Sequence, residues 1–300
     1  MKKNIVITGA STGFGKLTVQ TLAKDGHKVF ATMRGVEGKN KEYANDIKNW
    51  ALQHKLDVHV VELDVTSDTS VNEAAKKILA EAGQIDVVVN NAGVYSGGID
   101  ETFSVQDYKN IFDVNVFGVL RVNRAFLPSM RQHSNGLFVQ ISSLMGRFVI
   151  PFSAVYTSSK WAVEAIAESL RYELAPLGID SVIVQPGAFP TEIFSKVYEP
   201  ENQQIIAEYG ASVPHLQNFM GAFKNMMSGE IPNHPQHVAD AIKKLIDTPT
   251  GKRPLRTAVD KMMPETAQPI NEVQQKIQES FLSNMGLSEL LQIKESGVPA

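Results

Sequence analysis

The sequence predicts an α/β protein whose sheet is mostly parallel and doubly wound, with helices on both faces. Three observations predict this fold class. Short apolar runs rich in β-branched residues alternate with longer segments of helical period. A glycine-rich turn over 9–15 connects the first such run to the first helical segment. No internal repeat or low-complexity tract interrupts the alternation, so we expect a single domain over residues 1–300.

The elements of the first half of the chain are each predicted by their own pattern. The apolar run Ile5–Ile7 is typical of a buried strand. The helix that follows the glycine-rich turn has a suitable end at Gly26. In order, we expect a strand over 4–9, a helix over 13–26, a strand over 27–34, a helix over 40–55, a strand over 57–65, a helix near 68–82 and a strand over 85–93.

The second half continues the alternation as far as residue 187 and then changes character. We expect a long helix over 104–132, a strand over 136–143, a helix over 153–176 and a strand over 179–187. Residues 188–235 are rich in Pro, Met, Gly, Asn and Gln and have weak periodicity, so we expect an irregular insertion that serves as a substrate-binding loop or lid. A helix over 237–247, a strand over 254–260 and a C-terminal extension over 264–300, helical in parts, complete the prediction.

Composition excludes several classes of function. The 29 basic and 32 acidic residues give a net charge of −3, without the positive surface that a nucleic-acid-binding protein needs. The absence of cysteine excludes disulfides, thiolate metal sites and a cysteine nucleophile. The 7 histidines form no evident ligand set, so we expect no metal site. No apolar stretch is long enough to span a membrane or to form the core of a signal peptide, and we expect a cytoplasmic protein.

The glycine-rich turn indicates a phosphate site. A bound phosphate needs a tight turn, a close approach of backbone and a helix N-terminus that points at it. Gly9, Gly13 and Gly15 supply the first two, and the helix that begins at Gly13 supplies the third. The alternative is a strand-to-helix turn that needs glycine only for its geometry.

Three motifs, in this order and on these elements, resemble the short-chain dehydrogenase/reductases. They are Thr-Gly-x-x-x-Gly-x-Gly after the first strand, Asn-Asn-Ala-Gly over 90–93, and Tyr-x-x-x-Lys at Tyr156 and Lys160. The resemblance covers about residues 3–192. It implies a Rossmann-type fold of about seven strands in the order 3-2-1-4-5-6-7, with a nicotinamide cofactor along the carboxyl ends of the strands.

The end of the second strand bears on the choice of cofactor. Met33 stands where an acid would hold the ribose 2′-hydroxyl of NAD, and Arg34 follows it with a guanidinium group suited to a 2′-phosphate. We therefore expect NADP(H), with NAD(H) possible, although Arg34 could also be a solvated arginine at a strand end. The resemblance implies that the cofactor is bound by Gly9, Ser11, Thr12, Gly13, Phe14, Gly15, Arg34, Asp64, Val65, Asn91, Ala92, Gly93, Tyr156, Lys160, Pro186, Gly187 and Thr191.

The candidate catalytic residues are Asn115, Ser143, Tyr156 and Lys160. Tyr156 and Lys160 are four residues apart and share one helix face, so we expect the ammonium to favour the phenolate and to lower the pKa of Tyr156. The resemblance gives Ser143, rather than Ser142, the role of holding the substrate oxygen, and Asn115 the role of binding a water linked to Lys160. Without the other motifs, Tyr156 and Lys160 would be interpreted as an ordinary surface pair.

Together these features predict an NADP(H)-dependent oxidoreductase acting on CH–OH groups and carbonyls, a carbonyl reductase whose small-molecule substrate is fairly hydrophobic. One alternative is an NAD-dependent alcohol or hydroxysteroid-type dehydrogenase, and another, of a different class, is a non-catalytic nucleotide-binding protein. The resemblance also implies a homo-oligomer, a dimer or tetramer that pairs the helices over 104–132 and 153–176. We expect neither nucleic acid nor a membrane as a partner.

Overall fold

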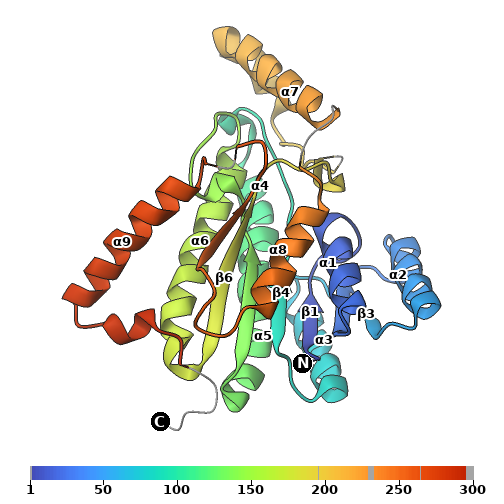
Figure 1. Ribbon diagram of the computed structural model, residues 1–300. Coiled ribbons are helices and arrows are strands. Elements are labelled where there is room, and N and C mark those ends of the chain that lie inside the picture. Colours follow the sequence, from blue (N-terminus) through green and yellow to red (C-terminus); the bar gives the residue numbers. More distant parts are fainter. Residues whose placement is uncertain (1, 195, 229–232, 264, 295–300) are drawn as a thin grey trace.

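The computed structural model describes residues 2–194, 196–228, 233–263 and 265–294, and its centre is a seven-stranded parallel sheet (Figure 1). The strand order is β3-β2-β1-β4-β5-β6-β7, which confirms the predicted fold class and order. The strands are β1 (Asn4–Ile7), β2 (Lys28–Met33), β3 (Val58–Glu62), β4 (Val87–Asn90), β5 (Gly136–Ile141), β6 (Ile179–Pro186) and β7 (Arg256–Val259).

Helices cover both faces of this sheet. Alternate residues of a strand point to opposite faces. Ile5 and Ile7 accordingly pack in one apolar cluster with α1 (Gly13–Lys24), α2 (Lys41–His54) and α8 (Gln236–Asp247). Val6 packs in another with α3 (Asp68–Ala82), α5 (Gly118–His133) and the end of α6 (Ala154–Leu174). The two clusters form a core on each side of the sheet.

Several strands end earlier than the sequence pattern suggested. The sequence predicted strands as far as residues 9, 93 and 143, but the structure ends them at Ile7, Asn90 and Ile141. The residues beyond these ends leave the sheet for turns at its carboxyl edge, where Gly9 adopts a positive φ of 63°. The motif residues therefore lie in loops at one edge of the sheet, where a doubly wound fold binds its ligands.

The long helix predicted over 104–132 is interrupted. The structure has α4 (Val105–Phe112), a π-helical turn (Asp113–Phe117) and then α5. Such a turn inserts one extra residue into the helical repeat and rotates the residues that follow it. Here it directs Asn115 into the interior, where its side chain is 1% exposed.

The segment over 188–235 is more regular than predicted. It contains the 3-10 turns Glu192–Phe194 and Gln203–Ser212 and the helix α7 (Val213–Ser228), which projects away from the rest of the fold in Figure 1. Leu216, Phe219 and Phe223 recur at helical spacing within α7, a signal hidden by the surrounding polar residues and glycines. Residues 195 and 229–232 lie outside the described residues, and the lid function of the segment stays a prediction.

The C-terminal extension predicted over 264–300 contains α9 (Gln268–Asn284) and a 3-10 turn (Ser288–Leu291). Residue 264 and residues 295–300 lie outside the described residues. α9 stands beside α6 (Figure 1) and is tied to the fold by side chains. Asn271 donates a hydrogen bond to Gln185 at 2.7 Å, and Gln274 donates to Glu168 of α6 at 3.4 Å.

Within the described part of the chain, no helix has the length and apolar character that crossing a membrane requires.

A buried ion cluster fastens the far end of α6 to the sheet. Asp180 of β6 is 0% exposed and pairs with Arg171 of α6 at 2.8 Å and with Arg253, just before β7, at 3.4 Å. Removing the carboxylate from such a buried cluster leaves the charges of the guanidinium groups uncompensated in a medium of low polarity.

Asp180→Asn is expected to lower the free energy of unfolding by about 3 kcal/mol, because two buried guanidinium groups lose their carboxylate. Urea denaturation at pH 7 measures this loss. The matched control is Asp68→Asn, whose carboxylate is 78% exposed in its pair with Arg121 and whose loss should cost under about 1 kcal/mol. Equal losses for the two variants would contradict the role given to the buried cluster.

Candidate active site

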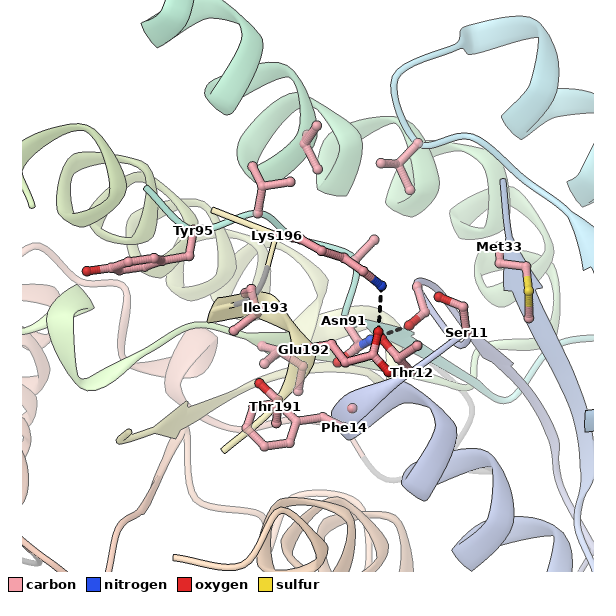
Figure 2. Close-up of a pocket in the computed structure, with 18 of the residues that line it drawn as sticks. Ser11, Thr12, Phe14, Met33, Asn91, Tyr95, Thr191, Glu192, Ile193 and Lys196 are labelled. Atoms are coloured by element: carbon pink, nitrogen blue, oxygen red, sulfur yellow. Dashed lines mark hydrogen bonds and ion pairs between the residues drawn. The ribbon is translucent and has the colours of Figure 1, made fainter. Parts of the chain in front are cut away.

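A cavity of about 580 Å³ lies at the carboxyl edge of the sheet, and Figure 2 shows it extending from Tyr95 at one end to Met33 at the other. Most of the residues predicted for the site line it. Two of the predicted residues, Gly15 and Asn115, do not line the cavity. The predicted residues that line it are Gly9, Ser11, Thr12, Gly13, Phe14, Arg34, Asp64, Val65, Asn91, Ala92, Gly93, Ser143, Tyr156, Lys160, Pro186, Gly187 and Thr191.

The glycine-rich turn has the geometry that a diphosphate requires. Gly9 and Gly13 have positive φ angles of 63° and 54°. A Cβ on Gly9 would lie 2.8 Å from Cα of Ala92, and one on Gly15 would overlap the carbonyl oxygen of Gly9. The Thr12 side chain makes no capping hydrogen bond within the described part of α1, so the first N–H groups of the helix remain available to a ligand. The turn therefore fits the diphosphate of a dinucleotide.

Asn91 braces this turn from the neighbouring strand. Its Nδ2 donates hydrogen bonds to the carbonyl oxygens of Thr8 and Gly9 at 2.9 and 3.0 Å. The backbone N–H groups of Asn91 and Ala92 both donate to Oγ1 of Thr8 at 3.0 Å. The Asn-Asn-Ala-Gly motif thus holds the loop after β4 against the glycine turn. The motif by itself did not predict this contact.

Positive charge gathers at the Met33 end of the cavity. Arg34 and Lys39 both line the cavity, and Asp64 lines it as well. Burial acts to raise the pKa of Asp64, but hydrogen bonds from Thr66 and the charges of Arg34 and Lys39 outweigh burial and lower it. Lys39 was missed by the sequence reasoning. Its only signal was its position five residues after Arg34 in the same loop.

Ser143, Tyr156 and Lys160 lie together in the lining of the cavity. Ser143 lies beside Tyr156, close enough for its hydroxyl group to act on the pKa of the phenol. The ammonium of Lys160 lies 5.6 Å from the centre of the Tyr156 ring and donates to the carbonyl oxygen of Ile141 at 2.9 Å. Tyr156 is 8% exposed and Lys160 is 6% exposed. One wall of the cavity therefore presents a phenol, a hydroxyl and a buried amine within a few ångströms.

Burial dominates the acidity of both groups. It raises the pKa of Tyr156 well above its ordinary value, and Tyr95 adds to the increase. The hydroxyl group of Ser143 acts in the opposite direction but does not outweigh burial. In the protein without its cofactor the pKa of Tyr156 therefore lies above its ordinary value, and the lowering effect expected of Lys160 stays a prediction. Burial also lowers the pKa of Lys160 to about 8, opposed by the negative charge of Glu164.

Asn115 lies behind the cavity lining, where it binds Val94 and Ser159. Its Oδ1 accepts from the N–H of Val94 at 2.8 Å, and its Nδ2 donates to the carbonyl oxygen of Val94 at 3.0 Å and to Ser159 at 3.1 Å. A Cβ on Gly93 would lie 3.3 Å from Oδ1 of Asn115 and 3.8 Å from Nζ of Lys160. Because Gly93 has no Cβ, the space beside both the amide and the amine stays open, and a bridging water between them stays a prediction.

Aromatic residues form the Tyr95 end of the cavity. The rings of Tyr95 and Tyr156 are 4.9 Å apart, and Tyr95 also contacts Phe194 at 5.1 Å. Phe194 packs against Phe223 of α7 at 4.8 Å. Tyr95 was not predicted from the sequence, although it follows the Asn-Asn-Ala-Gly motif by two residues.

Three polar residues that line the same cavity, Tyr43, Glu192 and Lys196, bind one another. Lys196 pairs with Glu192 at 2.6 Å, as Figure 2 shows, and the hydroxyl of Tyr43 on α2 donates to Glu192 at 3.3 Å. The sequence reasoning missed all three residues, because Tyr43 is separated from the other two by about 150 positions and no motif connects them.

One cluster outside the cavity has the composition of a metal site. Asp25, His27 and Asp247 offer ligand atoms within 4.8 Å of one another. Lys243 already pairs with both carboxylates, at 3.0 and 2.5 Å. Nδ1 of His27 accepts the N–H of Lys3 at 3.1 Å, which places the imidazole proton on Nε2, the atom facing the carboxylates. The cluster is therefore a salt-bridge network rather than a set of free ligands.

Comparison with known proteins identifies relatives of this chain. The short chain dehydrogenase family matches residues 3–202. An uncharacterized oxidoreductase, YusZ, of Bacillus subtilis is 35% identical over 81% of this chain and 84% of its own. A 3-ketodihydrosphingosine reductase of Bacteroides thetaiotaomicron is 34% identical over 81% and 82%, and retinol dehydrogenase 8 of Bos taurus is 35% identical over 85% and 80%.

Solved structures agree with these relatives. A short-chain dehydrogenase from Streptomyces avermitilis superposes with a TM-score of 0.75 at 31% identity, over 95% of this chain and 99% of its own. An alcohol dehydrogenase from the archaeon Thermococcus sibiricus, complexed with 5-hydroxy-NADP, gives a TM-score of 0.67 at 27% identity, over 87% and 97%.

Lys160→Met is expected to stabilise the folded protein at pH 7 by about 2 kcal/mol, because it removes a charge whose burial is unfavourable. The folded-state pKa of about 8 is below the ordinary value of 10.5, so the unfolded chain binds more protons between these pH values. The contribution of Lys160 to stability therefore rises with pH across this window.

Urea denaturation of the wild type and the Lys160→Met variant from pH 7 to pH 10.5 measures this effect. The difference between them should shrink as the pH rises. The exposed Lys276→Met is the control and should change stability little at any of these pH values. A Lys160→Met variant that is equally destabilised across the range would contradict the prediction.

Proposed function

We propose that this chain, which belongs to the short-chain dehydrogenase family, is an NADP(H)-dependent oxidoreductase that interconverts a carbonyl compound and the corresponding alcohol. The observation that supports this best is the meeting of two features in one cavity. The glycine turn offers a diphosphate site, and the neighbouring side chains of Tyr156, Ser143 and Lys160 line the same cavity. A non-catalytic nucleotide-binding protein would need the first feature but not the second.

The proposed roles of the side chains follow from their chemistry. A bound nicotinamide cofactor supplies the hydride chemistry, which no amino-acid side chain provides. Ser143 and Tyr156 hold the oxygen of the substrate between their two hydroxyl groups. In reduction Tyr156 gives its proton to that oxygen as the carbon receives hydride, and in oxidation Tyr156 accepts the proton of the alcohol. A tyrosine is protonated at neutral pH and burial raises the pKa of Tyr156 further, so the proton that reduction needs is present on the phenol.

Lys160 is proposed to act on both the cofactor and Tyr156. Its ammonium is the charged donor nearest to Tyr156 on the same face of α6, and it lines the cavity between the glycine turn and the phenol. There it would donate hydrogen bonds to the ribose hydroxyls of a cofactor. It would also stabilise the phenolate that forms when Tyr156 releases its proton.

Two observations support a preference for NADP(H) over NAD(H). Arg34 and Lys39 place two positive side chains at the end of the cavity where the family binds the adenine ribose. The alcohol dehydrogenase from Thermococcus sibiricus, similar at 27% identity, is complexed with 5-hydroxy-NADP. An NAD-dependent alcohol or hydroxysteroid-type dehydrogenase is the alternative within the family.

The substrate is proposed to be a fairly hydrophobic ketone or aldehyde. Tyr95, Phe194 and Phe223 line or adjoin the approach to Tyr156 with apolar surface. The two named relatives carry the substrates 3-ketodihydrosphingosine and retinol in their names, and both molecules have long hydrocarbon parts.

We further propose a homo-oligomer that pairs α5 and α6 across a two-fold axis. Phe117, just before α5, is 46% exposed and Trp161 of α6 is 45% exposed, and such a pairing would cover both rings. The cytoplasmic location expected from the composition remains a proposal.

Tyr156→Phe is expected to lower kcat for carbonyl reduction by about a thousandfold, because the substrate oxygen loses its proton donor. A panel of hydrophobic ketones and aldehydes, followed by NADPH absorbance, measures this loss, and the Kd for NADPH should change less than about threefold. Tyr108→Phe, outside the cavity, is the control and should keep full activity. Wild-type protein that binds NADPH but reduces no member of the panel would favour the non-catalytic alternative.

Arg34→Ala is expected to weaken NADPH binding by about tenfold to a hundredfold and NADH binding by less than about threefold, because a charge-assisted contact to the 2′-phosphate is lost. Fluorescence titration with each cofactor measures both effects. Arg131→Ala, exposed at the end of α5, is the control for a general change in surface charge. Equal losses for the two cofactors would remove the basis for the NADP(H) preference.

A further inference from the structure

A buried carboxylate lies directly behind the wall of the candidate site. Glu164 is one helical turn beyond Lys160 on α6 and is 3% exposed. A glutamate in such a position is costly to bury unless its charge is balanced and its oxygens are hydrogen-bonded. Glu164 does not belong to any of the three motifs, and its sequence position alone indicates no function.

The carboxylate of Glu164 is held at both oxygens. Oε1 accepts a hydrogen bond from Nε2 of Gln185 at 2.9 Å, and Oε2 accepts from Nε of Arg256 at 2.7 Å. Gln185 is itself fixed, because its Oε1 accepts from Asn271 of α9 at 2.7 Å. The orientation of the carboxylate is therefore set by groups from β6, β7 and the C-terminal helix.

Glu164 and Lys160 lie on the same face of α6 and reach neighbouring strands, although no ion pair joins them among the described residues. Residues four apart share a helix face, and helical side chains lean toward the N-terminus, so Glu164 leans back over the turn that carries Lys160. The ammonium of Lys160 binds the carbonyl oxygen of Ile141 at the end of β5. Glu164 binds Gln185 near the end of β6, the strand paired with β5 at Ile141. Both side chains thus end at adjacent strand termini.

The other charged groups around this pair are few. Arg256 bridges Glu164 and Glu168, at 2.7 and 2.5 Å, and its side chain is 4% exposed. Arg147, after β5, lies near both carboxylates and is 7% exposed. Tyr156 is the titratable group on the other side of Lys160. Glu168 is a further turn away from Lys160 and is bound by Arg256, Tyr172 and Gln274.

We propose that Glu164 is a positioning residue for Lys160: its fixed, buried carboxylate, one helical turn away, keeps the amine charged where the carbonyl oxygen of Ile141 holds it. The proposal rests on the function proposed above, in which a charged Lys160 acts on the cofactor and Tyr156. The negative charge of Glu164 opposes the effect of burial on the pKa of Lys160. Because Asn271 of α9 holds Gln185, and Gln185 holds Glu164, the C-terminal helix becomes part of the support of the site.

The test measures the protonation of Lys160 directly, in the protein without cofactor or substrate. A small acylating reagent reacts only with the unprotonated amine, so the pH midpoint of labelling at Lys160, followed by mass spectrometry of its peptide, reports its pKa. The wild type should give a midpoint of about 8. Glu164→Gln keeps the shape of the side chain and removes its charge, and should lower the midpoint by about one pH unit.

Glu168→Gln is the matched control, because it removes the other carboxylate bound to Arg256 and leaves Glu164 in place. Its midpoint should remain within about 0.3 unit of the wild type. An unchanged midpoint in Glu164→Gln, or an equal decrease in both variants, would overturn the proposal. If Glu164→Gln does not fold, Glu164→Asp retains the charge and should stay near the wild-type midpoint, and a decrease of a full unit in this variant would count against the proposal.

A second readout connects the pair to catalysis. The alkaline limb of the pH profile of kcat/KM should shift to lower pH in Glu164→Gln by the same amount as the labelling midpoint, and should not shift in Glu168→Gln. The labelling result does not depend on turnover. Failure of the wild type to reduce any carbonyl would therefore contradict the proposed function, while identical labelling midpoints would contradict the role of Glu164.

Discussion

The burial of one amine shapes the surroundings of the candidate site. Lys160 is 6% exposed, and an ammonium in such a place is unstable unless acceptors and negative charge compensate for the lost water. The carbonyl oxygen of Ile141 accepts its hydrogen bond, and Glu164 supplies the charge. Glu164 in turn requires Arg256 and Gln185 as partners. The strand ends, α6, β7 and the C-terminal helix are therefore connected through the compensation of a single buried charge.

A second constraint operates at the other end of the cavity, where backbone must approach backbone. Gly9 lies so close to Ala92 that a side chain would not fit, and Asn91 ties the same turn to β4 with hydrogen bonds to Thr8 and Gly9. The result is an open, preorganised helix N-terminus beside a rigid loop. The candidate phosphate site is thus held by close packing of backbone. The surroundings of Lys160, at the same edge of the sheet, are held by charge compensation.

The motif residues could be placed from the sequence because their spacing is local and the parallel sheet collects its strand ends at one edge. Three features were not accessible in this way. The π-helical turn that directs Asn115 inward leaves no clear periodic signal, because it changes the repeat by a single residue. The helix α7 was hidden by its polar and glycine-rich context. Burial raises the pKa of Tyr156, and the neighbours that bury it, such as Tyr95, are named by no motif.

The sequence by itself determined the fold class, the order of the strands through the family resemblance, and the residues that gather at the carboxyl edge of the sheet. These depend on periodicity and on short motifs, which a linear chain records directly. The tertiary structure decided which charges are compensated and by what. The association of Glu164 with Arg256 and Gln185, and of Glu192 with Tyr43, joins residues far apart in sequence. Such contacts, and the loss of water that gives them their strength, exist only once the chain has packed.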